Sequence, residues 1–104
     1  MRQIVLANLD KRRPAVVMTR AWMDGVTNRV TLAPITTTIK GLSTEVLLGV
    51  DNGLDQECVA SMDNIVTIPA QDVVRTVGRV LAHQELELAK AVVAAYDLRF
   101  PAVP

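Results

Sequence analysis

The chain is 104 residues long, half of them hydrophobic and 3% aromatic, with a formal net charge of zero. This length supports a single modest core, here built from Val, Leu, Ile and Ala, and no apolar run approaches the roughly 18 residues of a membrane span. The single cysteine excludes an internal disulfide and no leader of the secretory kind opens the chain, so we expect a cytoplasmic domain over residues 1–98 and a short tail over 99–104.

Short apolar segments alternate with turn residues along most of the chain. Their spacing of about ten residues predicts a compact antiparallel barrel or sandwich. The expected strands are residues 3–9, 13–19, 30–35, 44–50, 57–62, 65–68 and 76–81. The first two are predicted to form a hairpin joined by a polar turn at 8–12, and Asp51-Asn52-Gly53 ends the fourth strand. The polar connection over 20–29 carries Trp22 and an Asp24-Gly25 turn signal.

The pattern changes after Pro69. Residues 72–81 could form a helix by pattern alone, but a glycine and five β-branched residues favour a turn followed by the strand over 76–81. Residues 82–98 predict the one clear helix, because their apolar side chains recur at helical spacing. That helix is apolar nearly all round, so we expect it to be buried on two sides, by its own barrel and by a partner chain. The fold class is mainly β with a C-terminal helix.

The sequence contains no clear motif for binding a metal ion or a nucleotide. His83 is the only histidine and no second zinc ligand lies at a usual spacing, so we expect neither a metal site nor a cofactor. A surface or helix-cap role for His83 competes with a catalytic one. Residues 51–62 resemble a calcium loop faintly but lack its glycine and its final glutamate. Cys58 is either a buried apolar residue, the commoner fate of a lone cysteine, or a reactive thiol.

A guanidinium and a hydroxyl stand at the ends of two expected strands. Arg13 begins the second strand and Thr36 ends the third, and in an antiparallel sheet these ends lie on the same edge. Arginine binds two phosphate oxygens and a threonine hydroxyl donates a third bond. Because a ribose 2′-hydroxyl can attack its own phosphate, this pair is chemically sufficient for a slow, metal-free ribonuclease. The alternative is an ordinary hairpin surface and a threonine-rich strand end.

The charge is divided between the two halves of the chain. Residues 1–40 hold seven basic and two acidic side chains, a net +5, and residues 41–104 hold four and nine, a net −5. An anionic partner, if there is one, is therefore expected to meet the N-terminal half; the alternative is that these charges only solvate the surface. The side chains expected to contact RNA are Lys11, Arg12, Thr37, Thr38, Lys40 and Ser43.

A series of motifs, in chain order, carries a family resemblance: Arg13–Val17, Val30–Thr36, Gly53-Leu54, Asp63–Ile68, Val77–Val80 and the closing helix to Leu98. Together they resemble the MazF/PemK family of bacterial toxin endoribonucleases, and the mycobacterial members most closely. The resemblance implies a small SH3-like β-barrel of the MazF/CcdB toxin fold that forms a homodimer and binds single-stranded RNA along the dimer interface. It also implies a type II toxin–antitoxin system, with a cognate MazE-type antitoxin whose disordered acidic tail occupies the RNA groove.

The resemblance further implies the reaction. Cleavage in this family is sequence-specific and metal-independent, leaves a 2′,3′-cyclic phosphate and a 5′-hydroxyl, and inhibits translation. The family's catalytic arginine falls on Arg13, expected to move protons and hold the phosphate, and its threonine falls on Thr36, expected to stabilise the transition state.

The chain departs from the family pattern in two places. Only Asp10–Arg12 stands where most members have a longer loop, and Glu57-Cys58-Val59 replaces a common Asp-Ser-Val segment. The base specificity of other members therefore cannot be transferred. Two other functions remain open. One is a DNA gyrase poison of the same fold, although that activity uses a C-terminal tryptophan and the only one here is Trp22. The other is a catalytically silent barrel that binds an antitoxin-like peptide.

Overall fold

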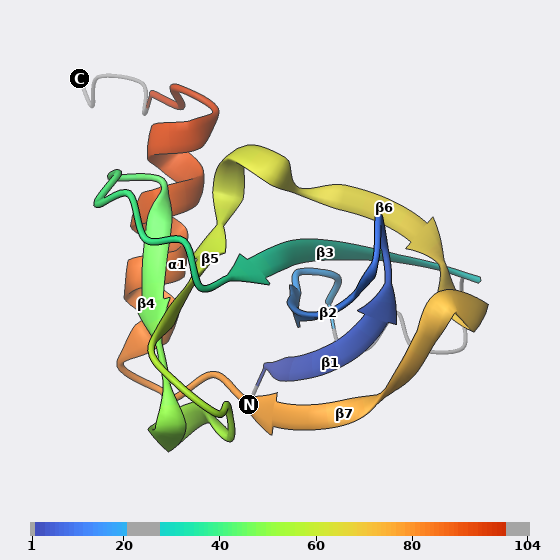
Figure 1. The fold of residues 1–104 in the computed structure, drawn as a ribbon. Helices are drawn as coiled ribbons and strands as arrows, with labels where there is room; N and C mark the ends of the chain where they lie inside the picture. The colour runs from blue at the N-terminus through green and yellow to red at the C-terminus, as the bar shows by residue number, and fades with distance from the viewer. Residues whose placement is uncertain (1, 21–27, 100–104) are drawn as a thin grey trace.

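The fold is an antiparallel sheet with one α-helix packed against it, seen in a computed structural model that describes residues 2–20 and 28–99 (Figure 1). The strands are β1 (Gln3–Asn8), β2 (Arg12–Val17), β3 (Arg29–Thr36), β4 (Glu45–Leu48), β5 (Cys58–Ser61), β6 (Val66–Pro69) and β7 (Val73–Arg79). The helix α1 spans Gln84–Ala95, and short 3₁₀ helices form η2 (Val50–Asn52), η3 (Met62–Asn64) and η4 (Ala70–Asp72). The prediction of a mainly β protein with a C-terminal helix is confirmed.

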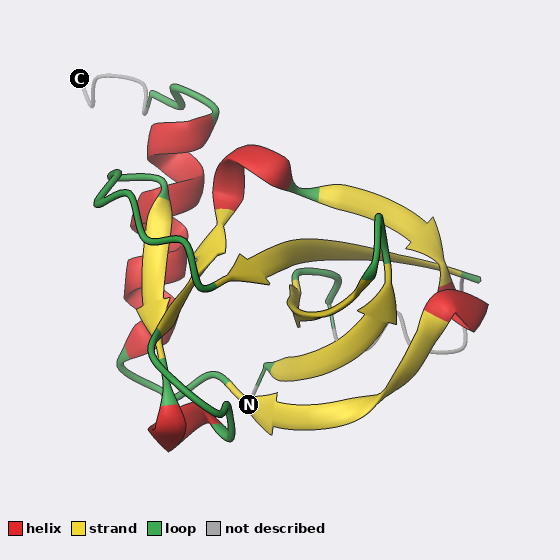
Figure 2. Ribbon diagram, in the orientation of Figure 1, coloured by secondary structure: helices red, strands yellow, loops and turns green. Residues whose placement is uncertain are grey.

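Strand β3 is the centre of the sheet. The strand order is β4-β5-β3-β2-β1-β7, and β6 also pairs with β3. Residues 29–32 of β3 pair with β6, residues 32–34 with β2, and residues 35–36 with β5, so β3 passes from one set of neighbours to another along its length. Since η4 joins β6 directly to β7, the strands curl around a common interior (Figure 2).

Both faces of the hairpin β1–β2 are buried away from its turn, which explains the apolar runs Ile4–Ala7 and Pro14–Val17. Val5 and Ala15 belong to the cluster inside the curled sheet. Their neighbours Ile4 and Val16 point the other way, into a second cluster that includes Leu88 of α1. Side chains alternate between the faces of a strand, so a sheet covered on both sides requires apolar residues at consecutive positions.

The predicted bounds of every element differ from the structure by one to three residues, and the largest differences are at the last strand and the helix. The last strand begins at Val73 rather than at residue 76, because η4 completes the turn after Pro69 earlier than expected. The helix is shorter than the predicted 82–98. It ends where Asp97 adopts a positive φ of 49° and the backbone N–H of Leu98 bonds to Val93 O at 3.0 Å. This is the Schellman arrangement, in which glycine is the usual residue.

The helix is covered on one side only. Leu88 and Ala91 are buried against the sheet. Leu86, Tyr96 and Leu98 remain exposed in the single chain, with 62%, 54% and 50% of their surface accessible. The predicted burial by its own barrel is therefore confirmed, and burial by a partner chain stays a prediction. No helix of the described residues is long and apolar enough to cross a membrane.

The segment η2 is fastened to β7 and α1 through a tight backbone contact and a buried polar pair. A Cβ on Gly78 would lie 1.8 Å from the Asn52 carbonyl oxygen, and Gly53, at φ +89°, lies against the same stretch of β7. The Asn52 side-chain amide donates to Gln84 Oε1 at 2.6 Å and to Arg79 O at 2.9 Å. Both amide side chains are buried, so these bonds satisfy groups that water cannot reach.

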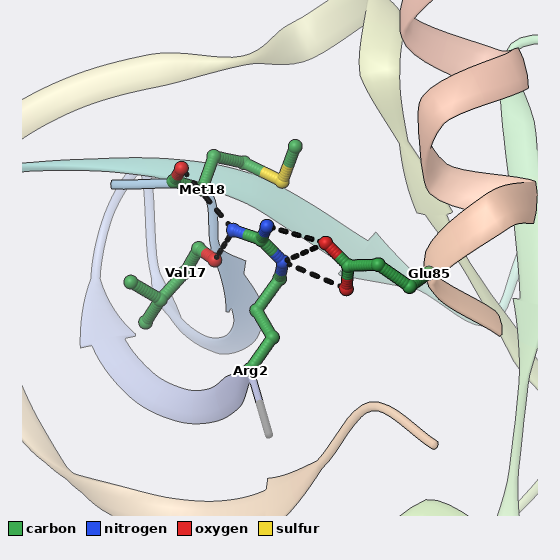
Figure 3. Close-up of polar contacts among 4 residues, drawn as sticks. All are labelled: Arg2, Val17, Met18 and Glu85. Atoms are coloured by element: carbon green, nitrogen blue, oxygen red, sulfur yellow. Dashed lines mark hydrogen bonds and ion pairs between the residues drawn. The ribbon is translucent and has the colours of Figure 1, made fainter. Parts of the chain in front are cut away.

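Arg2 links the start of the chain to the helix (Figure 3). Its guanidinium donates to Glu85 Oε1 at 2.6 Å and to the carbonyl oxygens of Val17 and Met18 at 2.9 and 3.2 Å. One side chain therefore holds together the entry to β1, the end of β2 and the first turn of α1. The predicted features at Trp22, Asp24-Gly25 and the tail after residue 99 lie outside the described residues.

Candidate active site

Arg13 lies in β2 with its guanidinium partly buried. Its backbone stands opposite Ala7 of β1, and its side chain is 21% exposed. One terminal nitrogen donates to Asp10 Oδ2 at 2.8 Å. The Nε–H is buried and has no partner in the part of the chain that the structure describes. Arg13 therefore has one hydrogen-bond donor that is not used within the chain. A buried N–H without an acceptor costs free energy, so an acceptor on a bound substrate would be favourable here.

Asp10 is the partner of Arg13 that sequence reasoning missed, since it was assigned only to a polar turn. A backbone hydrogen bond from Lys11 and the nearby charge of Arg13 hold the pKa of the Asp10 carboxyl below its usual range. The carboxyl is therefore ionised at neutral pH and balances part of the arginine charge. The acidic and basic residues three positions apart across a turn were the available signal.

Thr36 ends β3 at the point where β2 and β3 separate. The last pair between these strands is Ala15 opposite Pro34, and beyond it Thr36 pairs instead with Val59 of β5. Arg13 and Thr36 each lie two residues beyond that last pair, toward the same edge of the sheet. The Thr36 hydroxyl accepts a hydrogen bond from the Thr38 backbone N–H at 3.2 Å, which leaves its own O–H free to point elsewhere.

The remaining predicted RNA contacts fall into two exposed groups. Lys11 and Arg12 accompany Arg13 at the β1–β2 turn, where Arg12 Nε donates to Asn8 Oδ1 at 3.2 Å. The second group lies in the segment 37–44 between β3 and β4, which we call the β3–β4 loop. It contains Thr37, Thr38, Lys40 and Ser43, all exposed. Among the described residues, no hydrogen bond joins this loop to Arg13, whose side chain bonds to Asp10.

His83 and Cys58 take no part in this arrangement. His83 is exposed at the start of α1 and its side chain makes no cap hydrogen bond. Cys58 is buried in the core, and burial raises the pKa of its thiol, which keeps it protonated and unreactive at neutral pH. The described residues contain no group of three or more His, Cys, Asp or Glu side chains that could hold a metal ion.

A family model described as PemK-like, MazF-like toxin of type II toxin-antitoxin system matches residues 2–96. The chain belongs to this toxin family. Two curated relatives from Mycobacterium tuberculosis strains CDC 1551 / Oshkosh and ATCC 25618 / H37Rv, both named Endoribonuclease MazF3, are 49% identical over 98 residues. Each alignment covers 94% of this chain and 95% of the relative.

Solved structures of MazF-family toxins share the fold. The Mycobacterium tuberculosis toxin MazF-mt6 superposes with a TM-score of 0.92 at 47% identity, covering 94% of this chain and 99% of that one. A mycobacterial endoribonuclease in complex with its cognate antitoxin gives a TM-score of 0.84 at 23% identity, with 95% of both chains covered, and supports the fold alone. The predicted family and toxin fold are confirmed.

Proposed function

We propose that this MazF-family toxin is a sequence-specific, metal-independent endoribonuclease that cleaves single-stranded RNA and so inhibits translation. The observation that carries the proposal is Arg13, whose guanidinium is held by Asp10 yet retains a buried Nε–H without a partner, at the edge where Thr36 ends β3. The MazF3 relatives at 49% identity are named endoribonucleases, which supports the same activity for this chain.

The reaction requires only donors and a base. The ribose 2′-oxygen attacks the adjacent phosphorus, the bond from phosphorus to the 5′-oxygen breaks, and the products are a 2′,3′-cyclic phosphate and a 5′-hydroxyl. Solvent water accepts the 2′-hydroxyl proton and donates a proton to the departing 5′-oxygen, so the reaction has no net proton change. The guanidinium of Arg13 and the hydroxyl of Thr36 stabilise the extra negative charge on the phosphate oxygens in the transition state, where a fixed donor is worth about 3–4 kcal/mol.

Asp10 acts on Arg13 rather than on the RNA. A carboxyl whose pKa is lowered is a weak base at neutral pH, so it is poorly matched to accepting the 2′-hydroxyl proton. Its short bond to Arg13 fixes instead the direction of the guanidinium before the substrate arrives. Such preorganisation removes a cost that would otherwise fall on the transition state.

The exposed side chains around this pair are proposed to hold and select the RNA. Lys11 and Arg12 bind phosphates that flank the cleaved bond, since cations that contact the backbone supply affinity without base specificity. The β3–β4 loop, with Thr37, Thr38, Lys40 and Ser43, forms the wall that contributes to base choice. Single-stranded bases present hydrogen-bonding edges that hydroxyl and ammonium groups can read.

Two protein partners are part of the proposal, and both would act in the cytoplasm. A second copy of the chain would cover the exposed apolar side chains Leu42, Leu47, Leu86, Tyr96 and Leu98, of which Leu86 is 62% accessible. A MazE-type antitoxin would bind the toxin and block the RNA site; the mycobacterial endoribonuclease of the same fold was solved with its cognate antitoxin. Sedimentation that gives a monomer at micromolar concentration would contradict the homodimer.

The test is cleavage of single-stranded RNA by purified protein in excess EDTA. We expect cutting at a defined sequence, with 2′,3′-cyclic phosphate ends, and primer extension on total cellular RNA would identify that sequence. Arg13→Ala should lower kcat/KM by at least about 100-fold. Arg75→Ala, which removes an exposed arginine from β7, is the matched control and should cleave normally. A requirement for a divalent metal, or full activity of Arg13→Ala, would overturn the proposal.

A further inference from the structure

The β3–β4 loop is folded around a single carboxylate. Glu45, the first residue of β4, accepts backbone N–H bonds on Oε1 from Gly41 at 2.8 Å and from Lys40 and Leu42 at 3.1 Å each. Its Oε2 accepts a further contact from Lys40 N at 3.4 Å. Successive N–H groups that converge on one anion form a nest, a backbone arrangement suited to binding negative charge.

The loop sequence permits this nest at one particular residue. Gly41 has a φ of +75°, in the left-handed region that side chains rarely adopt, and no atom lies within 4 Å of the place where its Cβ would be. The glycine is therefore required by backbone conformation and not by crowding. While three loop amides bond to Glu45, the residues Ile39, Lys40 and Ser43 are exposed to solvent.

The far end of the loop is fastened separately. The Thr44 hydroxyl donates to Asp63 Oδ2 at 2.6 Å, and the Thr44 carbonyl oxygen accepts from the Met62 backbone N–H at 2.9 Å. Both Asp63 and Met62 belong to η3, which packs beside the loop's exit. With Glu45 holding residues 40–42 and η3 holding Thr44, the loop is constrained at its middle and at its end.

We propose that Glu45 is a positioning residue for substrate selection: its carboxylate fills the nest of residues 40–42 and fixes the loop so that Lys40 and Ser43 meet the RNA in one arrangement. This inference rests on the proposed ribonuclease function. With the nest occupied from within, the loop amides are unavailable to an RNA phosphate, and selection falls to the outward side chains. A loop ordered before binding also saves the entropy of ordering it on the substrate.

The experiment compares Glu45→Gln with the wild type in two measurements. The first is hydrogen exchange of the free protein, in which the amides of residues 40–42 should exchange faster in the variant because the acceptor loses its charge. The second is cleavage kinetics on the RNA sequence found by primer extension and on single-base variants of it. For Glu45→Gln, KM on the preferred RNA sequence should rise about tenfold, while kcat should change less than about twofold. The ratio of kcat/KM between the preferred sequence and its single-base variants should fall.

Two further variants make the result specific. Glu57→Gln removes the same charge at the opposite end of the β4–β5 hairpin and should leave exchange at 40–42 and KM unchanged. Glu45→Asp keeps the charge but is one methylene shorter, so it should weaken the nest even if Glu45→Gln does not fold. Far-ultraviolet circular dichroism and an unfolding curve establish that each variant compared is folded.

The outcomes separate this inference from the ribonuclease function itself. Unchanged exchange at residues 40–42 in both Glu45 variants overturns the role of the carboxylate without any reference to RNA. A fall in kcat with unchanged KM also overturns it, because Glu45 would then act on the reacting phosphate and not on the loop. If the wild-type chain cleaves no RNA, or if Arg13→Ala cleaves normally, it is the proposed function that fails.

Discussion

Asp10 and Arg13 form an ion pair of 2.8 Å across the β1–β2 turn, and it leaves the arginine with a buried Nε–H that has no partner in the described chain. The pair is exposed on the acid's side, since Asp10 is 70% accessible, and such pairs contribute little to stability. The hydrogen bond to Asp10 instead restricts the orientation of the Arg13 guanidinium.

We therefore predict that Asp10→Ala slows cleavage while the protein stays folded. We expect kcat to fall by about tenfold or more, because Arg13 loses the charged acceptor that orients it, and the unfolding temperature to stay close to that of the wild type. Asp10→Asn can still accept a hydrogen bond from Arg13, so its kcat should lie between those of the wild type and Asp10→Ala. Steady-state kinetics on a defined RNA measure this, with Asp51→Asn, at an exposed position of η2, as control. Normal kinetics for Asp10→Ala would show that the orientation of Arg13 does not depend on it.

Thr36→Val is predicted to reduce kcat through loss of one hydroxyl. Valine has nearly the same shape, so β3 should keep its pairing with β5, while a donor to the developing phosphate charge disappears. We expect a loss of about tenfold to 100-fold, and recovery of most of it in Thr36→Ser. Thr76→Val removes an exposed hydroxyl from β7, outside the proposed site, and should cleave at nearly the wild-type rate. Equal losses for Thr36→Val and Thr76→Val would show that the effect is not specific to Thr36.

The elements that were predicted well are those with a periodic signal. Each strand is located by an apolar run bounded by turn residues. Such runs occur because a strand buried on both faces needs apolar residues at consecutive positions. Residues 82–98 were recognised as a helix for the same reason, but their end was placed too late. That end depends on Asp97 at positive φ, a conformation for which glycine is the expected signal.

The site was only partly accessible to sequence reasoning, because its residues meet through the fold. Arg13 and Thr36 were identified from strand ends and from the family resemblance. The sequence indicates only a polar turn at Asp10, because residue spacing does not predict that the turn brings its carboxylate to 2.8 Å from the Arg13 guanidinium. The sequence predicts only that Glu45 lies in a strand. Its hydrogen bonds to the loop amides depend on the left-handed conformation of Gly41, which the sequence does not predict.

The stability of the protein is predicted to fall in acid through Glu85. Hydrogen bonding from Arg2 and, secondarily, the nearby positive charge of Arg2 hold the pKa of Glu85 below its ordinary value of 4.5. A carboxyl with a lowered folded-state pKa stabilises the fold above its unfolded-state pKa, and this contribution is lost as pH falls through the folded-state value. Since Glu85 is half exposed, the effect should be modest.

The measurement is thermal unfolding of the wild type and of Glu85→Gln at a series of pH values. At about pH 7 the variant should melt at a lower temperature, and the two curves should converge as the pH falls through the lowered folded-state pKa of Glu85, where the wild-type carboxyl also becomes neutral. Glu87→Gln, also in the first turn of α1 but without the Arg2 contact, is the control and should show a smaller difference. A wild-type advantage that persists unchanged to the lowest pH would mean that the Arg2 contact is not its source.

Gly78→Ala is predicted to be the most destabilising of these substitutions. The new Cβ would fall 1.8 Å from the carbonyl oxygen of Asn52, which is a backbone atom and cannot move away as a flexible side chain could. Either β7 or η2 must move, and movement of η2 would break the buried bond from Asn52 to Gln84 at 2.6 Å. Overpacking of this kind costs about 3 kcal/mol or more, which lowers the unfolding temperature of a domain of this size by about 10–20 °C. The control is Gly49→Ala, whose Cβ would meet its nearest atom at 3.9 Å and should melt close to the wild type. If Gly78→Ala unfolds at the same temperature as Gly49→Ala, the backbones of η2 and β7 must be able to separate enough to accommodate the new Cβ.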